Sequence, residues 1–396
     1  MNMNEQMKES EESILHTYNR FPVVFEKGQG CYLYDSEGKE YLDFAAGIAV
    51  NSLGYHYPGY DEALKDQIDK LMHISNLYYN EPIIEAGAKL VKASKMSKAF
   101  FTNSGTEAIE GALKAAKKYA YVRDGHADHE IIAMNHSFHG RSIGALSVTG
   151  TAHYREPFEP LMGGVKFADF NNLESVKAQI TDKTCAIITE VVQGEGGIYP
   201  AKKEFLEGLR QICDEKDIML IFDEIQCGMG RTGHYFAWQA YGAQPDIMTS
   251  AKALGCGVPV GAFVLNEKAA KASLEPGDHG TTYGGNPFVC AAVSKVFDIY
   301  ENDKIIEHVQ EMTPYLEQKL DEIVAKHECA ATRRGMGFMQ GIVIQGRPVG
   351  EVVKAALAKG LLVISAGSDV LRIVPPLVIT KEHIDKMAAI LDECME

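Results

Sequence analysis

The feature that most constrains the fold is a repeated alternation between short apolar runs and helix-like stretches. The runs are rich in β-branched and aromatic residues, and six of them read KAFFTN, EIIAMN, CAIITE, IMLIFDE, DIMTSAK and VGAFVL. Buried parallel strands have this composition, and their alternation with helices predicts an α/β fold with helices on both faces of the sheet. Because ligands bind at the carboxyl ends of such strands, polar residues that end a run are candidate site residues. Four runs end in this way, at Asn103, Glu190, Asp223 and Lys252.

The sequence pattern changes after about Gly285, where a long amphipathic region is followed by short strand-like runs and a final helix. Near the other end, YLYDSEGKEYLDF alternates around a Ser-Glu-Gly turn and predicts a hairpin, which we expect to pack with the C-terminal part. A chain of 396 residues also exceeds one ordinary core. We therefore predict a large domain over 56–285 and a smaller α+β domain formed by 1–55 and 286–396.

Charge and composition exclude several classes of partner. A net charge of -15 disfavours binding to nucleic acid and to anionic membranes. The polar, acidic N-terminal sequence does not resemble a signal peptide, and no apolar run is long enough to suggest a membrane span. The eight cysteines are scattered without a C-x-x-C pair, which favours reduced thiols and a cytoplasmic location.

A helix start with the features of an anion site follows the first of these runs. Ser104 and Glu107 have the spacing of a capping box before an amphipathic stretch. Gly105 lets the backbone approach an anion, and the free N–H groups of a helix N-terminus suit a phosphate. Taken alone, the same residues also fit an ordinary capped helix.

Asp223 ends an apolar run and admits several interpretations. A Walker-type metal site is disfavoured because the chain has no G-x-x-x-x-G-K-[ST] motif. The carboxylate could act in general acid/base catalysis, neutralise a cationic ring nitrogen, or only cap the strand. The following segment Gly228–Gly233 matches the dinucleotide motif G-x-G-x-x-G. We reject that interpretation because DEIQC separates the motif from its strand and no convincing helix follows.

Two cations lie in apolar sequence. Lys252 has small and apolar neighbours, and burial there would lower the pKa of its amine and free it to bond a carbonyl carbon. A surface lysine is the alternative, but the glycines behind Lys252 favour room for a ligand. Arg372 is embedded in VLRIVPPL, where it needs a carboxylate partner. We expect no metal site, since His136 and His139 lack the spacing of metal ligands.

With Asp223, Lys252 and the capped helix start in one chain, the pattern resembles the class III aminotransferases, which are fold-type-I pyridoxal-phosphate enzymes. The resemblance runs nearly end to end, through GKEYLDFAAGIAVNSLG, SNLYYNEP, FFTNSGTEA, FHGR, VVQGEGG, FDEIQCGMGRTG, the Lys252 stretch, GTTYGGNP and LRIVPPL. It implies a large domain with a mixed, mostly parallel sheet flanked by helices, plus a smaller α+β domain from both termini.

The resemblance also implies roles in holding the cofactor. Lys252 would hold pyridoxal phosphate covalently, and Asp223 would keep the ring nitrogen of the cofactor protonated. The other cofactor contacts would come from Gly105 and Thr106 at the phosphate, Phe138 and Ile225 on the two ring faces, Gln226 at the 3′-oxygen, and Thr282 at the phosphate of a neighbouring subunit. The contact from Thr282 implies a homodimer with shared active sites.

Within the family, Ser75–Tyr79 and Gly47–Val50 most resemble the acetylornithine aminotransferases of arginine biosynthesis. Ornithine aminotransferases have Tyr in place of Ile48, whereas 4-aminobutyrate aminotransferases share the Ile. Departures from the family pattern include Tyr55 and Tyr57, which bear on substrate choice.

The implied reaction is transamination between N-acetylornithine and 2-oxoglutarate, giving N-acetylglutamate semialdehyde and glutamate. Tyr18 and Arg141 would hold the α-carboxylate of acetylornithine. Arg372 would hold that of glutamate, with Glu195 as its resting partner. Another ω-aminotransferase, acting on ornithine, succinylornithine or 4-aminobutyrate, is the alternative. Outside this class the rivals are a nicotinamide-dependent oxidoreductase and a nucleotide-binding regulatory module.

Overall fold

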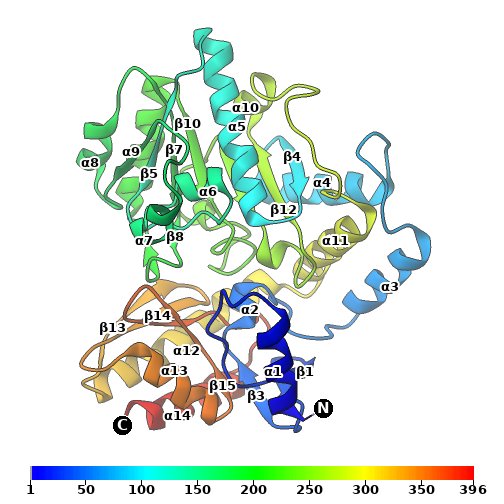
Figure 1. Ribbon diagram of the computed structural model, residues 1–396, viewed down its shortest axis with the longest axis vertical. Coiled ribbons are helices and arrows are strands. Elements are labelled where there is room, and N and C mark those ends of the chain that lie inside the picture. Colours follow the sequence, from blue (N-terminus) through cyan, green and yellow to red (C-terminus); the bar gives the residue numbers. More distant parts are fainter. Residues whose placement is uncertain (1) are drawn as a thin grey trace.

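The computed structural model describes residues 2–396, and a seven-stranded sheet forms its upper part (Figure 1). The strand order is β4-β12-β11-β10-β7-β5-β6. All neighbours from β11 to β6 pair in parallel, and only β12 runs antiparallel to both of its neighbours, so the predicted mixed, mostly parallel sheet is confirmed. The strands are β4 (Lys98–Thr102), β5 (Glu130–Met134), β6 (Val165–Ala168), β7 (Thr184–Glu190), β10 (Met219–Asp223), β11 (Ile247–Ser250) and β12 (Gly261–Leu265).

Helices cover both faces of this sheet because its strands are apolar on both sides. In β10, Met219 and Ile221 belong to one core cluster with α5, while Leu220 and Phe222 belong to the other with α9. The helices of this part are α3 (Tyr60–Lys70), α4 (Glu81–Ser94), α5 (Gly105–Asp124), α6 (Ile143–Ser147), α7 (Ala152–Arg155), α8 (Leu173–Gln179), α9 (Lys203–Lys216), α10 (Glu267–Lys271) and α11 (Pro287–Asn302). Shorter elements are β8 (Val192–Gln193), β9 (Tyr199–Pro200), η1 (Glu156–Phe158), η2 (Ala237–Ala240) and η3 (Lys252–Leu254).

The lower part brings the two ends of the chain together (Figure 1). One four-stranded sheet has the order β1-β2-β3-β15 and the other β13-β14-β17-β16. The predicted hairpin is β2–β3, and β15 pairs with β3 in parallel, so the hairpin joins the C-terminal segment as expected. The strands are β1 (Phe25–Gln29), β2 (Tyr32–Asp35), β3 (Glu40–Asp43), β13 (Ala330–Met336), β14 (Met339–Ile344), β15 (Leu361–Leu362), β16 (Ile364–Ala366) and β17 (Val370–Ile373). The helices are α1 (Met3–Ser13), α2 (Ala46–Ala49), α12 (Ile305–Lys326), α13 (Val349–Ala358) and α14 (Lys381–Met395).

The division of the chain into domains at 55/56 and 285/286 stays a proposal. α11 begins two residues past the second boundary, yet it packs against α3 and α4 of the upper part. Among residues 2–396, no helix is both long and apolar enough to cross a bilayer.

The short helix α2 is left-handed. Its four residues have φ angles of 49° (Ala46), 63° (Gly47), 66° (Ile48) and 62° (Ala49). The Ala49 N–H donates to the Ala45 carbonyl at 3.0 Å, and the Val50 N–H donates to the Ala46 carbonyl at 2.7 Å, which is the bonding pattern of one α-helical turn. L-residues pay roughly 1–2 kcal/mol each in this conformation, and a β-branched residue is the least suited to it. Tertiary contacts must therefore hold this turn.

Candidate active site

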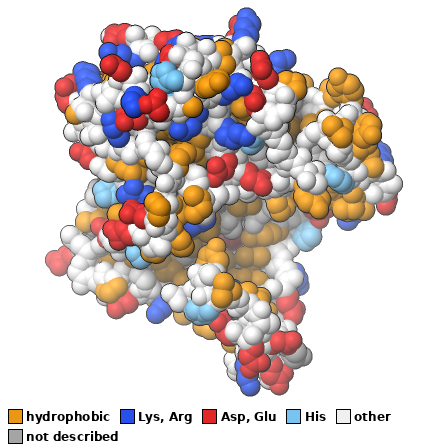
Figure 2. Space-filling view, turned by 45° about the horizontal axis from the view of Figure 1, so that its top comes forward, with side chains coloured by type: hydrophobic (Ala, Val, Ile, Leu, Met, Phe, Trp, Pro, Cys, Tyr) orange, Lys and Arg blue, Asp and Glu red, His pale blue; other side chains and the backbone are white. Residues whose placement is uncertain are grey.

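A cavity of about 490 Å³ lies at the carboxyl ends of β7, β10 and β11. Figure 2 shows the surface hollowed between the upper and lower parts of the molecule. The cavity wall includes most of the residues that the sequence singled out, namely Gly105, Thr106, Phe138, Arg141, Glu190, Glu195, Asp223, Ile225, Gln226 and Lys252. Strand-end position, which can be read from the sequence, accounts for Glu190, Asp223 and Lys252, while most of the others were named from the family resemblance.

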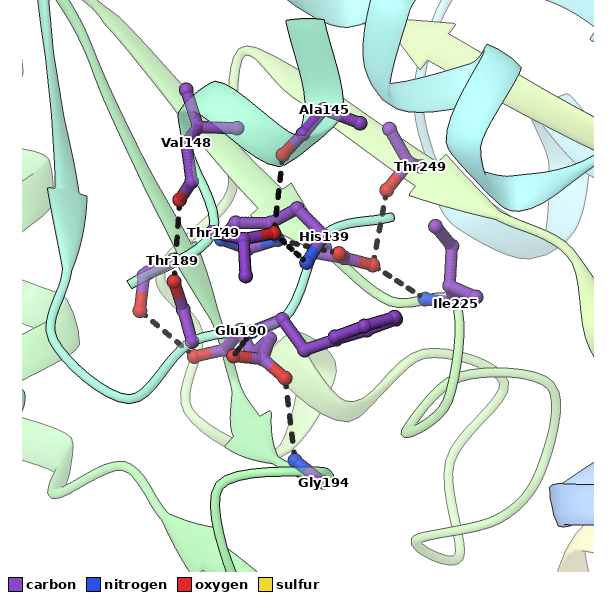
Figure 3. A network of polar contacts seen from close by, with 12 residues as sticks. His139, Ala145, Val148, Thr149, Thr189, Glu190, Gly194, Ile225 and Thr249 are labelled. Carbon is purple, nitrogen blue, oxygen red and sulfur yellow. Dashed lines mark hydrogen bonds and ion pairs between the residues drawn. The ribbon is translucent and has the colours of Figure 1, made fainter. Parts of the chain in front are cut away.

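Asp223 is buried, and both of its carboxylate oxygens have partners. Its Oδ1 accepts hydrogen bonds from the Ile225 N–H at 3.0 Å and the Thr249 hydroxyl at 3.3 Å. Its Oδ2 lies 2.7 Å from the ring nitrogen Nδ1 of His139 (Figure 3). The backbone N–H of His139 donates to the Thr149 hydroxyl at 3.0 Å. These contacts fix the direction of the carboxylate. Sequence reasoning considered His139 only as a metal ligand and missed this contact, for which its place in the FHGR motif was the one signal.

Glu190 is the strand-end partner of Asp223, since the two Cα atoms pair across β7 and β10. Its carboxyl group accepts the N–H groups of Phe138 and Gly194 at 3.4 and 3.3 Å (Figure 3). Burial, and then the nearby charge of Asp223, raise the pKa of Glu190 well above its usual range. The two strand-end acids of the cavity thus lie in different environments.

Lys252 opens the short helix η3 directly after β11, with a φ of 49°. Its Nζ donates to the Ile48 carbonyl of the left-handed turn at 3.2 Å. Burial lowers the pKa of the Lys252 amine to about 8, against the opposing attraction of Glu195. The neutral amine is therefore accessible near neutral pH, as its apolar sequence predicted.

The buried Arg372 on β17 is joined to the cavity by Glu195 and Gln226. Arg372 Nη1 donates to Glu195 Oε1 at 2.5 Å and to Gln226 Oε1 at 3.1 Å, while Nη2 donates to the Ser365 carbonyl at 3.2 Å. Gln226 Nε2 also donates to Glu195 Oε1 at 3.2 Å. Burial alone would raise the pKa of Glu195, but the Arg372 guanidinium holds it below its usual range.

The N-terminus of α5 offers a place for an anion. Within residues 2–396, no group accepts a hydrogen bond from the N–H of Gly105 or Thr106, and both residues line the cavity. Ser104 caps the helix by accepting the Glu107 N–H at 3.3 Å. The predicted capping box is only half present, because the Glu107 carboxylate reaches one residue further and accepts the Asn103 N–H at 2.6 Å. Two free N–H groups and the helix dipole suit a phosphate.

Two predicted residues lie elsewhere. Tyr18 is exposed and lines a separate hollow beside α1, and Thr282 is exposed and does not line the cavity of its own chain. Gly228–Gly233 form a buried turn between β10 and the 3-10 helix η2, so no helix begins at the dinucleotide-like motif.

Histidine and carboxylate side chains approach one another away from this cavity. Among the described residues, one such group, Asp124, His126 and His129, has potential ligand atoms within 4.8 Å of one another. No member of the group lines the cavity, and the Asp124 carboxylate is already held by both Arg123 and His129. We assign no metal to it.

Known proteins that are similar to this chain are aminotransferases. The class-III aminotransferase family matches residues 14–395. The acetylornithine aminotransferase of Clostridium acetobutylicum is 47% identical over 98% of this chain and 100% of its own length, and the succinylornithine transaminase of Yersinia pseudotuberculosis is 43% identical over 94% and 92%. The crystal structure of ornithine aminotransferase from Toxoplasma gondii superimposes with a TM-score of 0.95 at 28% identity, over 100% of this chain and 95% of that one. The chain therefore belongs to the class-III aminotransferases, which are pyridoxal-phosphate-dependent enzymes.

Proposed function

We propose that this aminotransferase exchanges an amino group between N-acetylornithine and 2-oxoglutarate, giving N-acetylglutamate semialdehyde and glutamate, a step of arginine biosynthesis. One observation carries the proposal: Lys252 shares a cavity with Glu195, which is paired with the buried Arg372. A reactive amine beside a guanidinium with a removable partner suits a site that takes two unlike amino donors. The names of the relatives support this substrate class.

Pyridoxal phosphate fits the residues present. The amine of Lys252 would hold the cofactor, Asp223 would pair with its ring nitrogen, and the free N–H groups of Gly105 and Thr106 would bind its phosphate. Phe138, Ile225 and Gln226 would complete the cradle, as they line the same cavity. When bound, the cofactor supplies an electron sink for the carbon that carries the amino group.

Lys252 would then serve as both base and acid. A pKa of about 8 leaves part of the amine neutral near pH 7, so it can take a proton from the substrate carbon that bears the nitrogen. The positive charge that Lys252 gains is offset by Glu195 and Asp223, which both favour its protonated form. The same side chain can return the proton later in the reaction.

Two arginines would divide the carboxylates between them. Arg372 would bind the α-carboxylate of glutamate once Glu195 turns away. Arg141 stands at the cavity wall with its guanidinium 4.1 Å from the ring centroid of Tyr154 and 5.3 Å from that of Phe138. It would hold the α-carboxylate of acetylornithine, with Tyr18 as a second donor if the N-terminal segment closes. Ornithine, succinylornithine and 4-aminobutyrate are the alternative donors.

We further propose a cytoplasmic homodimer with shared active sites. The exposed apolar side chains include Leu71, Met72, Leu77, Tyr78 and Tyr79, and hydrophobic atoms gather at the right-hand edge of Figure 2, where α3 and α4 lie in Figure 1. Thr282 would reach the phosphate site of the neighbouring subunit. The free cysteines, most of them buried, suit a reducing compartment.

The decisive experiment combines a donor panel with two variants. The purified enzyme should convert N-acetylornithine faster than ornithine, succinylornithine or 4-aminobutyrate, with 2-oxoglutarate as acceptor.

Lys252→Ala should lose at least roughly 10³-fold in turnover, because it removes the residue proposed as cofactor anchor and proton carrier. Asp223→Asn should still bind the cofactor but stall in proton removal, having lost a charged hydrogen bond worth roughly 1.5–3 kcal/mol. Near-normal turnover in Lys252→Ala would refute the assignment of the site.

A further inference from the structure

We propose that the left-handed turn α2 is a positioning device for Lys252, in which the Ile48 carbonyl holds the lysine amine whenever the amine is free of the cofactor. The proposal rests on the proposed function in one respect, that Lys252 is the reactive lysine. It assigns positioning roles to Asp43, which caps the turn, and to the backbone of Ile48.

The turn points a backbone acceptor at the amine. Lys252 Nζ donates to the Ile48 carbonyl at 3.2 Å, across 204 positions of sequence. In a right-handed turn the carbonyl groups would point differently, so this contact depends on the unusual hand. Local sequence does not demand that hand, since Gly47 alone of the four residues favours positive φ. Strain of this kind persists where surrounding structure imposes it, and it concentrates at functional sites.

Asp43 imposes the start of the turn. Its buried carboxylate accepts the N–H groups of Ala45 and Ala46 through Oδ1, at 2.9 and 2.7 Å. Its Oδ2 accepts the Tyr55 hydroxyl at 2.8 Å, and that hydroxyl accepts the Asn51 side-chain N–H at 3.1 Å. The capping group, the turn and Asn51, which lies two residues past the turn, are therefore linked by one set of hydrogen bonds.

The flanking backbone is tied to three other segments. The Phe44 N–H donates to Leu362, and the Phe44 carbonyl accepts from Val374, both at 2.9 Å. On the far side, the Leu53 N–H donates to the sulfur of Cys256, four residues after Lys252. The Leu53 contact therefore joins the segment of the turn to the Lys252 loop, while the Phe44 contacts anchor the other end of that segment to the C-terminal part of the chain.

The remaining charges around Lys252 set the sign of the test. Glu195 and Asp223 favour its protonated form, while burial, Arg372 and Arg231 oppose it. The Ile48 carbonyl accepts from the amine and adds to the side that favours the proton. Releasing the carbonyl should therefore lower the pKa of Lys252 further and make the amine more reactive at a given pH.

The experiment measures the reactivity of Lys252 in the full-length protein freed of cofactor. Trace labelling with acetic anhydride is followed from pH 6 to pH 10, and acetylation of the Lys252 peptide is quantified by mass spectrometry against exposed lysines. We expect Asp43→Ala to move the Lys252 profile to lower pH by about half a unit, equivalent to an about threefold faster labelling below the midpoint.

Asp35 provides a matched control. It is also a buried carboxylate that accepts two backbone N–H groups, those of Glu37 and Lys39, and one tyrosine hydroxyl, that of Tyr41. Asp35→Ala should cost stability in the same way and leave the Lys252 profile unchanged. Asp43→Asn should restore the wild-type profile, because its amide oxygen can still cap the turn, and it thereby separates capping from loss of charge.

Ile48→Gly covers the case in which Asp43→Ala does not fold. Glycine has no steric penalty in the left-handed region, so this variant should fold, yet its looser backbone should shift the Lys252 profile in the same direction. The proposal is overturned if folded Asp43→Ala and Ile48→Gly both label like the wild type, or if Asp35→Ala shifts the profile equally. If the proposed function itself is wrong, a different result shows it: Lys252→Ala would still transaminate.

Discussion

At the scale of single residues, the surroundings decide the chemistry. Lys252 and Glu195 carry opposite charges, yet the pKa of each lies below its usual value, for different reasons. Burial dominates at Lys252, whereas at Glu195 the Arg372 guanidinium, Lys252 and Gln226 together outweigh burial. Glu190, without a cation, shifts the other way. Burial without a partner favours the neutral form, and a close partner of opposite charge favours the ionised form.

Burying Lys252 therefore lowers the free energy of unfolding, and its proposed function requires that burial. Its folded pKa of about 8 lies below the ordinary 10.5, so the unfolded chain binds the proton more tightly. The cost is complete below pH 8 and disappears as the pH rises past 10.5. Lys252→Met should raise the free energy of unfolding of the cofactor-free protein by roughly 1–3 kcal/mol at pH 7, and by little at pH 11.

Urea unfolding at several pH values checks this prediction. Lys354→Met is the control, since Lys354 is an exposed lysine on α13 and its replacement should leave stability nearly unchanged at every pH. A gain for Lys252→Met that did not diminish at high pH would show that packing, not charge, is responsible.

Glu195 is the residue whose removal should separate the two half-reactions. Acetylornithine brings no carboxylate next to its reacting amine, so a bare Arg372 would face a methylene group at a cost on the order of 3–5 kcal/mol. Glu195→Ala should therefore favour glutamate over acetylornithine in relative kcat/KM. A tenfold shift corresponds to about 1.4 kcal/mol. Single-turnover absorbance measurements of each half-reaction provide the test, and equal losses in both would contradict it.

At the scale of elements, close approach of helix and sheet places the site. α5 must lie near β11 and β12 for its N-terminus to reach the cavity, and it packs against both strands. Gly111 allows this approach, because a Cβ there would lie 2.2 Å from the ring of Phe263. The close packing of α5 on the sheet therefore depends on Gly111, although glycine has a poor helix propensity.

Gly111→Ala should destabilise the protein by roughly 1–3 kcal/mol through overpacking, although alanine gains up to about 1 kcal/mol in helix propensity. Gly350→Ala on α13 is the matched control, since a Cβ there meets no atom within 4 Å and the change should be neutral or stabilising. Thermal unfolding of both variants measures the difference. Equal midpoints would show that the Phe263 ring moves aside without cost.

At the scale of the whole molecule, an apolar surface around Leu77 and Tyr79 is exposed in the single chain. These side chains are 86% and 95% exposed, which is unusual for groups of their size. Under the proposed homodimer a second copy covers them and brings Thr282 to the neighbouring phosphate site.

The double variant Leu77→Lys/Tyr79→Lys should therefore sediment as a monomer and bind the cofactor more weakly, because it loses both the contact surface and the shared residue. Tyr121→Lys/Val122→Lys, at the exposed end of α5, is the control and should keep the wild-type sedimentation. Sedimentation velocity over a concentration series measures the assembly. A wild type that remained monomeric throughout would end the homodimer proposal.

The sheet, and the edge of it at which the site lies, could be predicted from the amino-acid sequence. The predicted runs became strands, and Glu190, Asp223 and Lys252 meet because the carboxyl ends of parallel strands share one edge. That rule needs only local composition and strand direction. The cap marked the helix N-terminus at Gly105 but fitted an ordinary capped helix equally well, and the phosphate contacts of Gly105 and Thr106 were implied by the family resemblance.

Contacts between distant segments could not be predicted from local sequence. The acceptor for the Lys252 amine is a main-chain carbonyl, which no side-chain pattern marks. The pairing of Arg372 with Glu195, 177 positions away, was expected only from the family resemblance and not from any local pattern. The contact between His139 and Asp223 depends on how a loop folds over β10. Local propensity even opposes the left-handed turn at Ala46–Ala49, because three of its four residues avoid that conformation. Only packing and the Asp43 cap can offset such a cost, and the packing forms only when distant parts of the chain come together.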